Sequence, residues 1–170
     1  MRKDLLEMSE MMTLVIREDV KNNRGNAINW ENISHKYNLS EDFIREFQDK
    51  VIWHNISSHQ ALSEDFITEF QHKVSWNDIV QCQLLSEDFI KNLLREFKNY
   101  VDLFWISRYQ ILSENFIREF QDKVYWVHIC LHQKLSKEFI AEFIDDIYFE
   151  YMLINEKISK EVKDYCRMFL

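Results

Sequence analysis

Carboxylates are the side chains of this sequence best suited to chemistry, because paired acids can act as general acid and general base. They recur in the motif Leu-Ser-acid-acid-Phe-Ile, or a close variant, at Leu39, Leu62, Leu85, Leu112 and Leu135. An active site is a single constellation of groups, whereas every helix start benefits from a serine cap and nearby acids. The repetition therefore indicates helix-capping roles, and we predict no catalytic residue.

His128, Cys130 and His132 form the densest group of metal-type ligands in the chain. The two histidines are four residues apart and could face one metal ion from a helix. No nearby acid or second cysteine completes a set, and neither histidine recurs as a motif. With a single glycine, the chain also cannot form a glycine-rich phosphate loop. The sequence therefore predicts a non-enzyme with no metal and no cofactor.

A short helix, a turn and a second capped helix, expected over residues 30–47, superficially resemble a DNA-binding helix-turn-helix. The second helix would begin with Glu41 and Asp42, which repel phosphate. The whole chain carries 29 acidic and 21 basic residues, a net charge of −8. We do not expect nucleic acid as a partner, and a helix-turn-helix-like nucleic-acid binder is kept only as an alternative.

The spacing of the motif predicts the elements that position these groups. Its leading residues follow one another in steps of 23, 23, 27 and 23 residues, and a degenerate copy starts 23 residues later at Ile158. A fixed period of this size is typical of stacked repeats. Each repeat should hold a long helix after the motif serine, a tight turn and a shorter helix near a tryptophan. The sequence predicts an all-α fold, an α-solenoid of about five 23-residue helix-turn-helix repeats with helical caps.

The long helix is expected to have one apolar and one charged face. Apolar residues recur at helical spacing, as at Phe66, Phe70 and Val74. Glutamate–lysine pairs four residues apart should lie on the solvent face and contribute about 0.2–0.5 kcal/mol each. These pairs are Glu46/Lys50, Glu69/Lys73 and Glu119/Lys123.

The ends and the middle of the array depart from the repeat. Residues 1–27 are expected to form an N-terminal capping helix. The repeat array covers residues 28–157, and a four-residue insertion at residues 91–94 should lengthen one helix by about a turn. Residues 158–170 are predicted to be a degenerate C-terminal repeat and cap. Together these parts should form one single domain.

The repeats resemble those of short-repeat proteins from giant DNA viruses that infect amoebae, a largely uncharacterised family. The resemblance rests on the Leu-Ser-Glu-Asp-Phe-Ile motif and the Glu-Phe and Val-x-Trp that follow it, as in residues 39–53. It covers about residues 28–165. Two departures are the four-residue insertion and Leu103, which replaces the tryptophan of its repeat. The resemblance implies a viral origin and names neither an activity nor a functional residue.

The composition of the chain limits the cellular compartments in which the protein is expected. The chain has 170 residues, of which 46% are hydrophobic, so it is expected to fold with a continuous core. Its three cysteines are odd in number and scattered, which fits a reducing compartment. The charged start does not match a secretory signal, and no apolar run is long enough to span a membrane. We predict an intracellular protein of the host cytoplasm or the virion that is not secreted and has no membrane partner.

Binding of another protein is the function that the sequence favours, because repeat stacks present variable positions on a fixed frame. Late in the chain, the short helices gain apolar residues beyond those of the frame. The candidate partner-binding residues are Leu94, Phe104, Trp105, Val127, Leu131, Tyr148 and Tyr151. They would contact an unknown host or viral protein or form a homo-oligomer; alternatively, they pack on the inserted turn and the C-terminal cap. A structural virion component is the second hypothesis.

Overall fold

The computed structural model describes residues 2–22, 28–97 and 101–170, which form helices and no strand. The α-helices are α1 (Arg2–Lys21), α2 (Trp30–Lys36), α3 (Glu41–Glu46), α4 (Trp53–His59), α5 (Glu64–Glu69), α6 (Trp76–Cys82), α7 (Glu87–Glu96), α8 (Leu103–Tyr109), α9 (Glu114–Glu119), α10 (Trp126–His132), α11 (Lys137–Glu142), α12 (Phe149–Ile154) and α13 (Lys160–Cys166). A 3₁₀ turn, Arg167–Phe169, follows α13.

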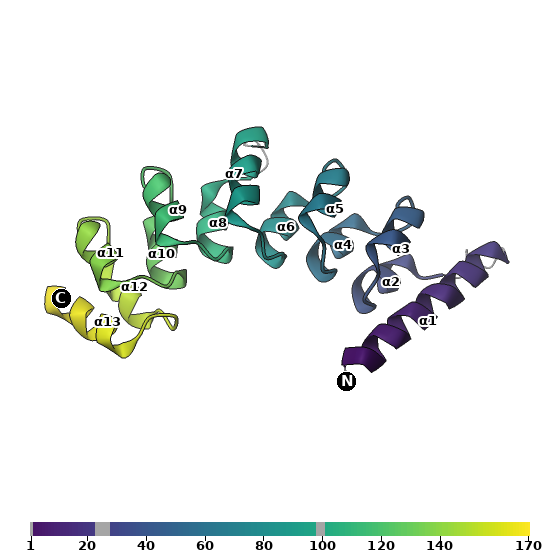
Figure 1. Cartoon of the computed structure of the whole chain (residues 1–170), viewed down its shortest axis with the longest axis horizontal. Helices are drawn as coiled ribbons and strands as arrows, with labels where there is room; N and C mark the ends of the chain where they lie inside the picture. Colours follow the sequence, from purple (N-terminus) through teal and green to yellow (C-terminus); the bar gives the residue numbers. More distant parts are fainter. Residues whose placement is uncertain (1, 23–27, 98–100) are drawn as a thin grey trace. The chain divides into compact units, whose positions relative to one another are not determined.

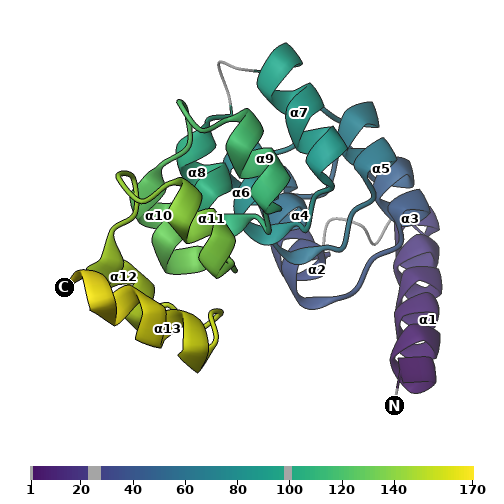
Figure 2. The same ribbon diagram turned by 60° about the vertical axis from the view of Figure 1, so that its left-hand side comes forward.

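Contacts group the chain into two compact units, which we call unit one (Met1–Gln83) and unit two (Leu84–Leu170). In unit one, α4 packs between α2 and α6; in unit two, α10 packs between α8 and α12 (Figure 1). Within unit one, α3 and α5 form a second row, and α7, α9 and α11 do so within unit two (Figure 2). Successive helical pairs therefore stack as in an α-solenoid, and the predicted fold class is confirmed. The single-domain organisation stays a prediction.

The motif serines begin the motif helices, as predicted. In α5, for example, the backbone N–H of Phe66 donates to Ser63 Oγ at 3.2 Å. Serine has extended backbone angles at this position and stands just before the first helical residue. The same bond recurs at Ser40, Ser86, Ser113, Ser136 and Ser159. Each such cap contributes about 1 kcal/mol to helix stability.

The prediction of a long motif helix is wrong for most repeats. Helices α3, α5, α9 and α11 have 6 residues each, one fewer than the helices that begin near tryptophan. After Glu46 the chain leaves helical geometry at Phe47 (φ −111°, ψ 26°). The N–H of Val51 then donates to the Phe47 carbonyl at 3.1 Å and closes one separate turn. Helix α7 has 10 residues, so the predicted extra turn of residues 91–94 is confirmed.

The predicted glutamate–lysine pairs within one helix are also wrong. Each glutamate is the last residue of its helix, so the lysine four positions later lies beyond the helix end. The glutamates bind cations two helices earlier in the chain instead: Glu46 binds Arg17 (2.6 Å), Glu69 binds Arg45 (2.8 Å) and Glu119 binds Lys91 (2.6 Å). The ion pairs therefore join neighbouring repeats and do not support single helices.

Helix α1 occupies the place of the predicted N-terminal cap. Thr13 and Ile16 are buried, and Arg17 Nε donates to Glu46 of α3 at 2.6 Å. Residues 1 and 23–27 of the predicted segment lie outside the described residues, and the capping role stays a prediction.

Aromatic side chains form much of the core around α3, α5, α9 and α11. The motif phenylalanines Phe43, Phe66, Phe116 and Phe139 are fully buried. The tryptophan that begins a short helix lies over the motif helix that follows it in the chain: the ring centroids of Trp53 and Phe70 are 4.9 Å apart, and those of Trp126 and Phe143 are 5.1 Å apart. Burial of each such side chain contributes roughly 2–3 kcal/mol.

Candidate partner-binding surface

A ladder of buried amides fixes the short helices to one another. The side chain of Gln133, 1% exposed, donates from Nε2 to the carbonyls of Ser107 (3.0 Å) and Gln110 (2.8 Å). Its Oε1 accepts from the N–H of Leu112 at 3.0 Å. These two carbonyls lie at the end of α8, where the last turn of a helix leaves carbonyls unpaired. Each repeat therefore caps the short helix of the repeat before it.

The same amide recurs at the other repeats. In unit one, Gln60 donates to the carbonyls of Ser34 and Tyr37, and Gln83 donates to those of Ser57 and Gln60. At the end of unit two, Asn155 donates to the carbonyls of Cys130 and Gln133. This ladder was not predicted from the sequence, although the glutamines Gln60, Gln83, Gln110 and Gln133 repeat in the same 23- and 27-residue steps as the motif.

A second ladder runs through the fifth residue of the short helices. Ser57 Oγ donates to the Trp53 carbonyl at 2.8 Å and accepts from the N–H of Ser75, just before the next short helix, at 2.9 Å. In unit two, Cys130 Sγ takes this place and accepts from the N–H of Tyr148 at 3.4 Å. Burial raises the pKa of the Cys130 thiol to about 11, so the side chain stays a neutral thiol.

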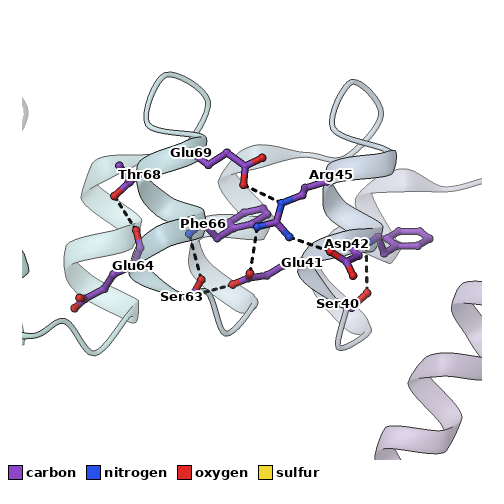
Figure 3. A network of polar contacts seen from close by, with 10 residues as sticks. Ser40, Glu41, Asp42, Arg45, Ser63, Glu64, Phe66, Thr68 and Glu69 are labelled. Carbon is purple, nitrogen blue, oxygen red and sulfur yellow. Dashed lines mark hydrogen bonds and ion pairs between the residues drawn. The ribbon is translucent and has the colours of Figure 1, made fainter.

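The motif carboxylates form a third ladder along the other row of helices (Figure 3). Glu41 Oε1 accepts from the N–H of Ser63 at 2.7 Å, and Glu114 accepts from that of Ser136 at 2.6 Å. Arg45 of α3 also reaches α5: its Nε donates to Glu69 at 2.8 Å, and its guanidinium lies 5.0 Å from the centre of the Phe66 ring. The first acid of the motif therefore has the same structural partner in three copies, at Glu41, Glu87 and Glu114, and a structural role accounts for its repetition.

The frame leaves the second, third, sixth and seventh residues of each short helix open to variation. In α2 and α4 these positions are all polar: Glu31, Asn32, His35 and Lys36, then His54, Asn55, Ser58 and His59. In α8 and α10 most are apolar or aromatic: Phe104, Trp105, Arg108 and Tyr109, then Val127, His128, Leu131 and His132. Side chains of unit two thus differ sharply from those of unit one on an otherwise identical scaffold.

Two groups of rings form this surface of unit two, which we call the aromatic face (Phe104, Trp105, Tyr109, Tyr125, Val127, His128, Leu131, His132, Tyr148 and Tyr151). In the first group, Phe104 lies edge-on to Trp105 (4.9 Å), Tyr125 (5.0 Å) and His128 (4.7 Å). The second group is the pair Tyr148 and Tyr151, 5.9 Å apart. Edge-to-face pairs of this kind pack rigidly and stabilise by about 0.5–1.5 kcal/mol each.

The structure places six of the seven predicted contact residues on the aromatic face. Tyr148 is 50% exposed and Tyr151 36%, while the other four, Phe104, Trp105, Val127 and Leu131, are half-buried. Leu94 does not belong to this group; it lies on α7 and lines a hollow described below. Partner binding by these residues stays a prediction, and so does the alternative that they pack on the inserted turn and the C-terminal cap.

Two histidines lie within the aromatic face. The rings of His128 and His132 are 5.8 Å apart, and His128 Nδ1 is buried with no hydrogen-bond partner among the described residues. Burial, with Arg108 nearby, lowers the pKa of His128. Burial also lowers the pKa of His132, together with the charges of His128, Lys157 and Arg108. Both imidazoles are therefore neutral at neutral pH, which keeps this part of the face uncharged.

These histidines and Cys130 do not meet as a metal site in the part of the chain that is described. The thiol is buried in the ladder, whereas the imidazoles pack on the aromatic face. No group of three or more histidine, cysteine, aspartate or glutamate side chains among the described residues could hold a metal ion.

Acidification is expected to destabilise the fold through His128 and His132. Folding lowers both pKa values below the ordinary 6.5, so the unfolded chain takes up protons first as the pH falls. The two neutral imidazoles should make their full contribution to the free energy of unfolding above about pH 6.5. This contribution should be lost as the pH falls through the lowered pKa values. Urea unfolding at about pH 7.5 and about pH 5 measures this loss.

The double variant His128→Gln/His132→Gln should lose less stability between these two pH values than the wild type does. The exposed His72→Gln variant is the control and should follow the wild type. An equal loss in the double variant and the wild type would show that these two histidines do not cause the pH dependence.

Comparison with protein-family models, with curated proteins and with solved structures gives no match for this chain. The resemblance to giant-virus repeats therefore stays a prediction. None of the helices described here combines the length and the apolar character needed to cross a bilayer.

Proposed function

We propose that this chain is a non-enzymatic α-solenoid that binds another protein through the aromatic face of unit two. The observation that carries the proposal is the contrast between the open positions of α2 and α4, which are polar, and those of α8 and α10, which are mostly aromatic or apolar. Repeat proteins bind partners through such positions, because the frame residues are already committed to stacking.

The types of side chain on this face support a protein partner. Tyrosine and tryptophan are enriched at the centres of protein interfaces, because they offer large contact areas with few rotatable bonds. Tyr125, Tyr148 and Tyr151 remain 48%, 50% and 36% exposed in the isolated chain, so a partner could still bury much of their surface. The partner would be a host or viral protein or a second copy of this chain.

The geometry of the motif helices argues against the nucleic-acid alternative. The helix that would enter a DNA groove begins with Glu41 and Asp42, and both lie within 3.5 Å of Arg45, which is thereby neutralised. Acidic side chains at that position repel the phosphate backbone. The virion component and the viral origin stay predictions that no feature of the aromatic face favours over binding to another protein.

Tyr148→Ser and Tyr151→Ser together are expected to weaken partner binding at least about 30-fold, the loss typical of one interface hot spot. The measurement is affinity capture from cells that contain the protein, followed by titration of the captured protein with purified chain. Light scattering of the purified chain tests whether the partner is a second copy.

Tyr37→Ser is the matched control, since Tyr37 is a tyrosine of unit one with 38% exposure. It should bind as the wild type does. If a partner binds the control and the Tyr148→Ser/Tyr151→Ser variant with equal affinity, it does not contact these two tyrosines, and the proposal is contradicted.

A further inference from the structure

A hollow opens in unit two at the place where other repeats hold an indole. Trp30, Trp53 and Trp126 begin their short helices and cover the phenylalanines of the following motif helix. Leu103 takes this position in α8. A hollow of about 570 Å³ lies beside it, lined by Lys91, Leu94, Arg95, Val101, Asp102, Leu103, Glu119, Phe120 and Lys123. Its volume is within the range of sites that bind side chains and small ligands.

The phenylalanine beneath the missing indole is uncovered. Phe47, Phe70 and Phe143, each under a tryptophan, are 7–8% exposed, whereas Phe120 at the same place in its repeat is half-buried, as is Phe97 after α7. The ring of Phe120 still stacks on Phe116 with centroids 4.6 Å apart, as Phe143 does on Phe139 at 4.7 Å. The Phe116–Phe120 pair is therefore arranged as in the other repeats, and only the indole that would cover it is absent.

A lysine at the rim lacks the contacts that its counterpart Lys73 makes. In unit one, Lys73 lies 5.8 Å from the centre of the Trp53 ring and donates to Asp49 at 2.9 Å. Lys123 follows Phe120 by three residues, as Lys73 follows Phe70. The other two cations of the rim are paired, Lys91 with Glu119 and Arg95 with Glu96. Lys123 makes no ion pair or ring contact with the described residues, so a cation stands free at the edge of an apolar hollow.

We propose that this hollow binds the indole of a tryptophan from a partner protein, with an acidic residue beside that tryptophan paired to Lys123. The indole would lie on Phe120 as Trp126 lies on Phe143, at the stacking distances that aromatic pairs prefer. Lys123 would then face a ring, as Lys73 faces Trp53, and gain a carboxylate. The chain thus leaves one of its own core positions to be filled by its partner.

This inference shares with the proposed function the premise of a protein partner, but it uses other side chains. The hollow is lined by residues of α7, by residues 101–103 and by residues 119–123, not by Tyr148 or Tyr151. The two proposals can therefore fail separately. The present one fails if the peptide does not bind to the hollow. The proposed function fails if the tyrosine substitutions on the aromatic face leave partner binding unchanged.

The test uses the full chain and a synthetic pentapeptide, acetyl-Gly-Asp-Trp-Asp-Gly-amide, with binding measured by calorimetry. We expect saturable binding by the wild type, and at least about tenfold weaker binding when alanine replaces the tryptophan of the peptide. Leu103→Trp should abolish peptide binding, because the indole of the chain itself fills the hollow. The same variant should unfold at a higher urea concentration than the wild type.

A charge exchange tests the role of Lys123 without altering the core. Lys123→Glu should weaken binding of the acidic peptide at least about fivefold, and a peptide with lysines in place of its aspartates should bind this variant better than the wild type. The exposed Lys134→Gln variant should bind as the wild type does. No binding by the wild type, equal binding of the alanine peptide, or full binding by Leu103→Trp would each overturn the proposal.

Discussion

Replacement of Gln133 by alanine should lower the free energy of unfolding by about 3–6 kcal/mol. Three buried backbone groups lose their partner at once, namely the carbonyls of Ser107 and Gln110 and the N–H of Leu112. Each buried polar group left without a hydrogen bond costs about 1–3 kcal/mol. Chemical unfolding at constant pH measures the loss.

The control for this variant is Gln121→Ala, because Gln121 is an exposed glutamine in the turn after α9. Its free energy of unfolding should stay within about 0.5 kcal/mol of the wild type, as for most surface substitutions. If Gln133→Ala cost no more than Gln121→Ala, the amide ladder would not hold the repeats together.

The ladder also explains how a chain with one glycine ends so many helices. Helices commonly end at a glycine in the left-handed conformation, which pairs the last carbonyls within the same segment. Here the residues after the short helices are extended, as at Gln60 (φ −94°, ψ 145°) and Gln110 (φ −88°, ψ 156°). The carbonyls are paired by an amide of the following repeat instead. A short helix is therefore completed only when the next repeat is in place, which couples the folding of neighbours.

Features that depend on nearby residues were predictable from the sequence. The serine caps follow from a serine before two acids, and Ser63 and Ser86 adopt that role. The inserted turn follows from a four-residue change of step, and α7 is four residues longer than α5. Both involve interactions within a few positions along one helix, where spacing decides geometry.

Interactions between repeats were not predictable in the same way. The partner of Glu69 is Arg45, 24 positions earlier, while Lys73 at the favourable helical spacing lies past the helix end. A glutamine in a turn, such as Gln133, also has the sequence features of an exposed residue. Its repetition at the motif spacing was the one available signal that it belonged to the frame.

The two candidate sites also differ in whether their residues could be predicted from the sequence. The aromatic face was predictable because its residues occupy the open positions of short helices, as at Phe104 and Tyr151. The hollow was not predictable, because the apolar residues around Leu103 indicated that this repeat has more apolar surface than it needs, not less. A void arises from the fit of side chains across helices, and the replacement of a tryptophan by a leucine is its only trace in the sequence.

Phe143→Ala should lower the free energy of unfolding by about 3–5 kcal/mol, as for a closely packed aromatic residue of a core. Phe143 is 8% exposed, with its centroid 5.1 Å from Trp126 and 4.7 Å from Phe139. Phe120→Ala at the same place of the preceding repeat should cost about 1–2 kcal/mol less, because no indole covers Phe120 and fewer contacts are lost. Urea unfolding of both variants measures the difference.

A double-mutant cycle shows whether the missing indole is the cause of that difference. In a Leu103→Trp background, loss of Phe120 should cost as much as loss of Phe143 does in the wild type, because the new indole then rests on Phe120. The coupling between positions 103 and 120 should be about 1–2 kcal/mol, within the range for residues in contact. A coupling near zero would mean that the introduced indole does not occupy the hollow, and the free position over Phe120 would then not be shaped for a tryptophan from a partner either.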